Sequence, residues 1–176
     1  YVLRCVAGAG LPANEGLMRP VTIRTRPGSV VDARAPAAVS AGNVETSQRL
    51  VDVIFAALRA AAPDRIPSDS GGSMNNVLLG GTTGGAWVQY ETLACGAGAS
   101  AAGPGADAIH THMTNTLNTP VEAAEHAFPF RIERYAVRPP GGAEPGGHPG
   151  GSGIERAWRL LAPTEINLLS ERRRLA

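Results

Sequence analysis

The chain has 176 residues, a length typical of a single domain. Its 16 cationic and 15 acidic residues nearly cancel, which argues against a nucleic-acid-binding or membrane-surface protein. All 16 cations are arginine, so chemistry that requires a lysine is excluded. The 22 glycines and 14 prolines make up about a fifth of the chain and predict a modest core with much irregular backbone.

The two cysteines, Cys5 and Cys95, lie far apart in the sequence. They are compatible with one disulfide, but no signal peptide is recognisable, so two reduced buried thiols are favoured. No apolar run approaches the roughly 18 residues that span a membrane. We therefore expect a cytoplasmic protein. Because the chain begins with Tyr1 rather than Met and ends just after an arginine triplet, both ends resemble cuts through a longer polypeptide.

The first 31 residues have a β-rich pattern. Residues 1–7 form a short apolar run, and residues 21–26 alternate with the period of a half-buried strand. The clearest element is an amphipathic helix over about residues 43–61. Its apolar side chains share one face, at Val44, Val51, Ile54, Phe55 and Leu58, and the polar side chains Gln48 and Asp52 are assigned to other faces.

Residues 68–105 are interrupted repeatedly by glycine, with short strand-like runs at 77–79 and 86–93. Two interpretations of these glycines stay open. They mark tight turns and close backbone packing, or they form loops whose N–H groups approach a ligand.

The last third of the chain contains several short elements. Thr119 is expected to cap a short helix that starts at Pro120, and residues 131–137 alternate like a strand. Residues 139–153 form a Gly/Pro-rich loop, and residues 154–161 with 165–170 predict a closing hairpin. We therefore predict an α+β fold: a β-rich mixed sheet with the helix of about residues 43–61 packed on it. Parallel α/β layering is the alternative.

Residues 107–135 carry the densest chemistry. His110 and His112 are two positions apart, so on a strand both rings would share one face, as metal ligands or catalytic groups require. This spacing is a weak signal, and hydrogen-bonded structural histidines are the favoured alternative. Around them, short polar residues suit amide or carboxylate recognition, or a self-bonding turn, at Thr111, Thr114, Asn115, Thr116, Asn118 and Thr119.

A second polar motif, Asn75-Asn76, lies between two glycine pairs. It is compatible with an amide-binding or oxyanion loop, and equally with a turn in left-handed conformation. The sequence has no P-loop, C-x-x-C, H-E-x-x-H or G-x-S-x-G motif, so nucleotide chemistry within this chain is not supported.

Five segments occur in order over nearly the whole chain, at residues 14–20, 36–52, 72–76, 90–92 and 106–122. The most specific is the last segment, in which ADAIHTHMTNT at residues 106–116 is followed by TPVE at residues 119–122. In order and spacing these segments resemble the hydantoinase B family. That family groups N-methylhydantoinase B, the C-terminal part of 5-oxoprolinase and the alpha subunit of acetone carboxylase.

The resemblance implies part of the B-type subunit of an ATP-dependent cyclic-amide hydrolase that opens hydantoin or 5-oxoproline rings. ATP would bind an A-type partner subunit, which activates the substrate by phosphorylation. A divalent metal would be held mostly by residues outside this chain, so its ligands here are unknown. Residues 1–176 would form a single partial domain, the later-middle portion of such a subunit, and the isolated chain is expected to be inactive.

The resemblance also implies a set of site residues. Catalytic roles are expected at His110, His112, Asn115 and Glu122. Substrate-binding roles are expected at Asn75, Asn76, Glu91, Thr114 and Thr119. The expected partners are the A-type subunit and a small cyclic amide, with no nucleic acid and no membrane.

The chain departs from the family pattern in its glycine-rich loops. Ala97 and Ser100 stand where the family has tyrosine and arginine, and Pro149 stands at another arginine position. Losing an arginine removes a bidentate anchor for a carboxylate or phosphate. Two other functions therefore stay open: an acetone-carboxylase-type subunit that carboxylates an activated ketone, and a non-catalytic remnant or interaction domain.

Overall fold

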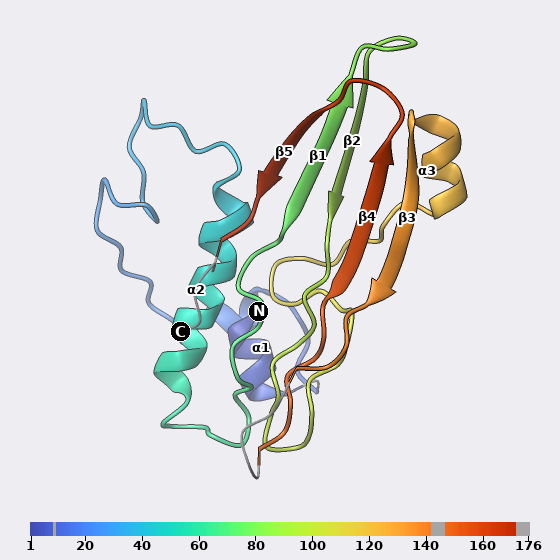
Figure 1. Ribbon diagram of the computed structural model, residues 1–176. Helices are drawn as coiled ribbons and strands as arrows, with labels where there is room; N and C mark the ends of the chain where they lie inside the picture. The colour runs from blue at the N-terminus through green and yellow to red at the C-terminus, as the bar shows by residue number, and fades with distance from the viewer. Residues whose placement is uncertain (9, 142–146, 172–176) are drawn as a thin grey trace.

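The computed structural model describes residues 1–8, 10–141 and 147–171 (Figure 1). Part of the expected 139–153 loop and the C-terminal arginine triplet lie outside the described residues. The elements in chain order are α1 (Val2–Ala7), the 3-10 helix η1 (Glu15–Met18), α2 (Gly42–Leu58), β1 (Asn76–Gly81), β2 (Trp87–Thr92), α3 (Val121–Ala127), β3 (Phe130–Val137), β4 (Ile154–Leu160) and β5 (Glu165–Leu169). This combination of antiparallel sheets and few helices confirms the α+β prediction.

The described strands form two antiparallel sheets, one with the order β2-β1-β5 and one containing β3 and β4. The expectation of one mixed sheet is therefore wrong. The predicted closing hairpin is also wrong, because β4 pairs with β3 whereas β5 crosses to the other sheet and pairs with β1. The short connection at residues 161–164 indicates a tight turn but does not determine which strand β5 pairs with.

The main core lies between the two sheets. It contains Val77 and Leu79 of β1, Phe130 of β3 and Ala124 of α3. Phe130 and Leu79 are 0% and 2% exposed. The Phe128 and Phe130 rings stack with their centroids 5.8 Å apart, and burying one such ring contributes about 1.5–3 kcal/mol. This core fixes the two sheets against each other and so fixes the loops at their ends.

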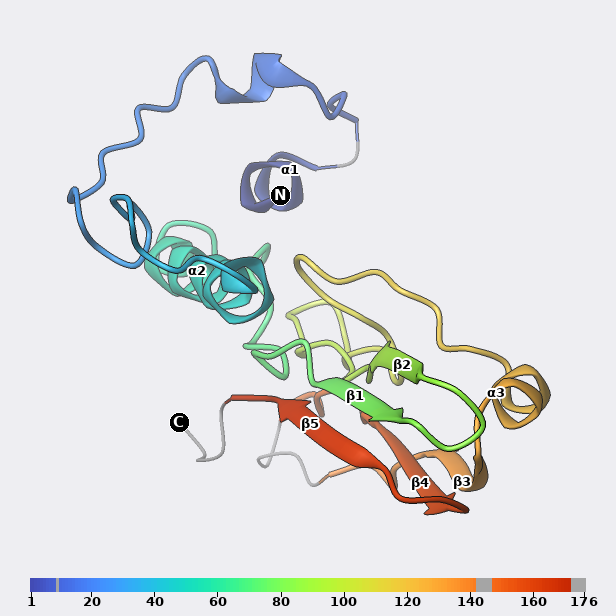
Figure 2. The ribbon, with the colours of Figure 1, turned by 90° about the horizontal axis from the view of Figure 1, so that it is seen from above.

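Helix α2 confirms the predicted long helix, although it ends at Leu58, three residues before the expected position. It does not pack on a sheet face as expected. Its apolar residues Val51 and Phe55 pack with Val2 and Ile66 in a second cluster, and among the described elements its close helical neighbour is α1. Figures 1 and 2 show α2 beside the end of the three-stranded sheet. The apolar run at residues 1–7 forms helix α1 rather than a strand. A run so short does not distinguish the 3.6-residue period of a helix from the two-residue period of a strand.

The alternating segment at residues 21–26 is not a strand. It is exposed, and no described strand pairs with it. Alternation predicts a strand only where a partner supplies the other half of the hydrogen-bond ladder.

The glycine-rich loops lie directly against one another. The Gly151 N–H donates to the Ala97 carbonyl, and the Gly105 N–H donates to the Pro149 carbonyl. A Cβ atom built at Gly98 would lie within 3.0 Å of the Ser68 carbonyl oxygen. Close backbone packing therefore explains these glycines, and it decides between the two interpretations that the sequence leaves open.

Candidate functional site

His112 lies against α2. Its Nε2 atom is 2.7 Å from Asp52 Oδ1 and 3.1 Å from Ser70 Oγ, and its side chain is 5% exposed. A serine–histidine–aspartate relay needs the carboxylate on one ring nitrogen and the hydroxyl on the other. Here both partners share Nε2, and Nδ1 is buried with no hydrogen-bond partner among the described residues. His112 therefore holds its loop on α2 and does not relay a proton between Ser70 and Asp52.

Thr114 anchors the same loop. Gln48 Nε2 donates to Thr114 Oγ1 at 2.6 Å, and Gln48 Oε1 accepts from the Met113 N–H at 3.4 Å. Gln48 and Asp52 are four residues apart and therefore lie on one face of α2. Both are buried together with Val51 and Phe55, so their assignment to other faces than the apolar one is wrong. Two polar residues at this spacing are the signal in the sequence that could have indicated the loop contact.

His110 faces a different environment, a cavity of about 290 Å³ that Thr116, Asn118 and Tyr135 also line. Burial lowers the pKa of His110 from its ordinary value of 6.5. A hydrogen bond with Thr116 raises the pKa, but its effect is smaller than that of burial. The neutral imidazole is therefore favoured, and it can donate one hydrogen bond and accept another. Because His110 lines this cavity and His112 packs on α2, the structure does not combine them as a shared pair of ligands.

A second cavity of about 400 Å³ adjoins the first, and Ala94 and Ile154 line both. The second cavity also contains Asn75, Asn76 and Cys95 in its lining. We call the two together the twin cavity. Its complete polar lining comprises Asn75, Asn76, Cys95, His110, Thr116, Asn118, Tyr135, Arg138 and Ser170. This lining contains no carboxylate, so it suits a neutral or anionic ligand better than a cation.

Asn75 and Asn76 have different surroundings. Asn75 has φ 52°, which places it in the left-handed region, and its Nδ2 donates to Cys95 Sγ at 2.6 Å while its Oδ1 accepts from Ser170 Oγ at 2.7 Å. Asn76 is 4% exposed, and neither its Nδ2 nor its Oδ1 has a partner among the described residues. An unpaired buried carboxamide costs about 1–3 kcal/mol, so Asn76 is a candidate for pairing with a ligand or an ordered water.

Cys95 and Cys5 are both free thiols, with no disulfide between them. Cys5 is exposed and Cys95 is half-buried, so the expectation of two buried thiols is wrong. Burial raises the pKa of Cys95, against a hydrogen bond from Asn75 that lowers it. The neutral thiol is therefore the favoured form at this position, and it acts as a polar wall of the cavity rather than as a nucleophile.

Glu91 is buried and Thr119 is half-buried. Glu91 Oε2 is 2.6 Å from Arg156 Nη1, with the two side chains 4% and 0% exposed. Glu91 Oε1 accepts from the Thr119 N–H at 2.8 Å. The Thr119 hydroxyl accepts from Gln89 and does not cap α3 as expected. Neither residue lines the twin cavity, so both position the segment that leads into α3.

Asn115 and Glu122 are exposed and line no part of the twin cavity. Glu122 lies in the first turn of α3, where a carboxylate stabilises the helix dipole. Asn118, which lines the cavity, belongs to the short polar residues singled out in the sequence but not to the site residues that the resemblance implies. Its Nδ2 donates to the Thr92 carbonyl at 2.8 Å and its Oδ1 accepts from the Tyr135 hydroxyl at 3.0 Å. Only the pairing of distant segments brings Tyr135 to this position.

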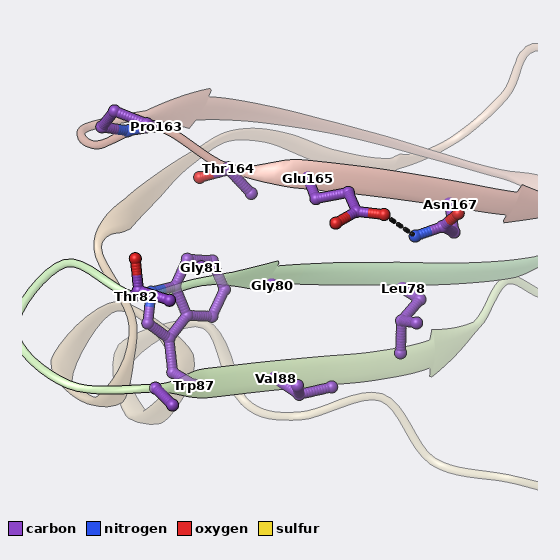
Figure 3. Close-up of a pocket in the computed structure, with 11 residues that line it drawn as sticks. Leu78, Gly80, Gly81, Thr82, Trp87, Val88, Pro163, Thr164, Glu165 and Asn167 are labelled. Carbon is purple, nitrogen blue, oxygen red and sulfur yellow. Dashed lines mark hydrogen bonds between the residues drawn. The ribbon is translucent and has the colours of Figure 1, made fainter.

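A larger hollow lies elsewhere, at the far end of the three-stranded sheet (Figure 3). It has a volume of about 780 Å³, and Gly80, Gly81, Trp87 and Val88 contribute to its lining. It contains none of the predicted site residues. We therefore take the twin cavity, where the polar run meets both sheets, as the candidate site.

Among the described residues, no three histidine, cysteine or acidic side chains are grouped as a metal site requires. Because the resemblance places the ligands of a divalent metal mostly outside this chain, no step is assigned to a metal here. Over the same part of the chain, no helix combines the length and the apolar character that crossing a bilayer requires.

The pH dependence of stability tests the burial of His110. Because its pKa is lowered in the folded protein, the unfolded chain takes up this proton first as the pH falls below about 6.5. His110 therefore lowers the stability of the folded protein as the pH falls through that range. We expect the free energy of unfolding of His110→Gln to fall less than that of wild type between about pH 7 and pH 5. Urea titrations at about pH 7 and pH 5 measure the free energy of unfolding. His126, exposed on α3, gives the matched control His126→Gln, which should follow wild type. Equal losses in both variants would contradict the burial.

The sequence is similar to a known protein family and to several known proteins. The sequence model described as Hydantoinase B/oxoprolinase matches residues 1–176. An uncharacterized protein, MJ0963, of Methanocaldococcus jannaschii is 42% identical over 98% of this chain and 30% of its own length. The 5-oxoprolinase 1 of Arabidopsis thaliana is 39% identical over 98% of this chain and 13% of its own length.

A Pseudomonas protein, provisionally named as the B-type subunit of a D-/L-hydantoinase, is 29% identical over 86% of this chain and 25% of its own length. The chain thus spans less than a third of the length of each of these relatives. No solved structure matches the chain.

Proposed function

The chain belongs to the hydantoinase B/oxoprolinase family, and from this membership we propose that it contributes a substrate-binding wall to an ATP-dependent hydrolase of cyclic amides. The observation that carries the proposal is the twin cavity. The segment with the strongest resemblance to the family, residues 106–122, supplies His110, Thr116 and Asn118 to its lining.

The lining matches the chemistry of a lactam that bears a carboxylate. A ring amide offers one donor and one acceptor, and both polar groups of the buried Asn76 carboxamide are unpaired among the described residues. Arg138 lies at the exposed rim of the lining and supplies a guanidinium for a carboxylate. The neutral imidazole of His110 provides a hydrogen bond to the amide without introducing a charge. We propose a 5-oxoproline-like or hydantoin-like substrate on this basis.

We propose that ATP acts on a partner of the A type, because one relative is named as the B-type member of a hydantoinase. Bound there, ATP would supply the phosphoryl group that activates the amide. The residues of this chain would hold the ring and keep its amide oriented. Asn115 and Glu122, for which the resemblance implies catalytic roles, are exposed and outside the twin cavity, so we give them no part in binding the ring there.

The experiment is a ring-opening assay of the intact protein with 5-oxoproline and with hydantoin, with and without an A-type subunit and ATP. We expect hydrolysis only when protein, A-type subunit and ATP are all present, and we expect bicarbonate to have no effect. Bicarbonate-dependent ATP turnover would instead identify a carboxylase. No substrate turnover by the complete mixture, with both subunits folded, would contradict the proposal.

A further inference from the structure

Residues 21–24 form an exposed arm with no partner in the described structure. In sequence the segment alternates the apolar Val21 and Ile23 with the polar Thr22 and Arg24, and all four residues are exposed and belong to no helix or strand. Ile23 is 70% exposed. No backbone hydrogen bond joins residues 22–25 to the rest of the described chain. This arm therefore has the pattern of a strand and lacks only the strand that would pair with it.

The same chain offers an open sheet edge. Strand β5 lies at the edge of the β2-β1-β5 sheet, and all five of its residues are exposed. Half of the backbone groups of an edge strand face away from its one neighbour, which makes the edge a template for another strand. Ile166 and Leu168 are 51% and 67% exposed and lie on one face of β5. Glu165 and Asn167 lie on the other face, where Figure 3 shows their side chains side by side.

The two segments are complementary in both apolar pattern and charge. In an antiparallel pairing with Ile23 opposite Ile166, Val21 comes opposite Leu168, so the exposed apolar residues cover each other. In the same register Arg24 comes opposite Glu165, on the polar face. Cross-strand pairs of these two kinds each contribute about 0.2–1 kcal/mol. No other register of these two segments combines both apolar pairs with an arginine opposite Glu165.

We propose that the arm of one chain adds to β5 of a second copy of the same chain. Both complementary segments are present in every copy, so two chains can exchange arms reciprocally around a twofold axis. Such an exchange closes and produces a dimer rather than a filament. The twin cavity takes no residue from the arm, and of the β5 positions named here only Leu168 lines it, so Arg24 and Glu165 can be changed without altering the cavity lining.

The test is the mass of the intact protein in solution, measured by light scattering over a range of concentrations. We expect wild type to be a dimer. Arg24→Glu and Glu165→Arg each place like charges opposite one another and should raise the dimer dissociation constant by about tenfold or more. The double variant Arg24→Glu/Glu165→Arg restores opposite charges and should dimerise like wild type. Circular dichroism checks that all variants fold.

Arg34→Glu is the matched control, because Arg34 is exposed on the same N-terminal segment but outside the paired residues. It should leave the dimer unchanged. A monomeric wild type would overturn the proposal. A dimer that both single charge reversals leave intact would also overturn it, as would a double variant that is no better than the single variants.

Discussion

Gly98→Ala should unfold the protein or lower its free energy of unfolding by about 3 kcal/mol or more. A Cβ at Gly98 would overlap the backbone carbonyl oxygens of Ser68 and Asp69. Backbone atoms cannot move aside as a flexible side chain does. The same Ser68 makes a cross-loop hydrogen bond through its N–H, which donates to the Ala99 carbonyl at 2.6 Å, so a local shift would also break the bond that holds the loops together.

The matched control is Gly42→Ala at the start of α2. A Cβ at Gly42 meets no atom within 4 Å, and alanine favours a helix by up to about 1 kcal/mol over glycine. Urea unfolding followed by circular dichroism compares the two variants. If Gly98→Ala were as stable as Gly42→Ala, the stacked arrangement of the glycine-rich loops would be wrong.

Glu91→Ala should cost about 3–5 kcal/mol, because it leaves the Arg156 guanidinium buried without its carboxylate. The loss also removes the acceptor of the Thr119 N–H, which fixes the chain ahead of α3. Replacing both partners, in Glu91→Leu/Arg156→Leu, removes the uncompensated charge. We expect the double variant to be more stable than Glu91→Ala.

The control is the exposed pair of Glu133 and Arg159, whose side chains are 44% and 69% exposed. Glu133→Ala should cost less than about 1 kcal/mol, because water screens an exposed pair. Urea titrations of all three variants measure these differences. Equal costs for Glu91→Ala and Glu133→Ala would mean that the Glu91 carboxylate is not buried in a pair.

Local patterns in the sequence predicted the elements that are stabilised locally. Helix α2 follows from its apolar spacing at Val51 and Phe55, and the strand at 130–137 follows from alternation. The sequence did not reveal what each element packs against. The α2 stripe is covered by α1, and β5 pairs with β1 across some 90 residues. Such long-range choices depend on which edges and faces remain open, and a local pattern does not contain that information.

The site residues, too, divide into those that a local pattern indicates and those that only long-range packing brings together. The sequence identified the polar run 107–119, but its alternation suggested that His110 and His112 share a face. The backbone at His112 has φ 59°, outside strand geometry, and the ring turns to Asp52 and Ser70. Of these two histidines, His110 lines the twin cavity and His112 does not. The partners Tyr135 and Arg138 come from β3 and the residue after it, and only the folded chain brings them beside the polar run.

We propose that the twin cavity binds the ring that is hydrolysed. Its most direct test is the rate of ATP-dependent 5-oxoproline hydrolysis by the intact protein with an A-type subunit, for His110→Gln and His126→Gln. His110 lines the cavity, and His126 is exposed on α3. We expect His110→Gln to lower kcat/KM about 100-fold and His126→Gln to leave it unchanged. Equal activity of the two folded variants would contradict the assignment of the twin cavity as the substrate site.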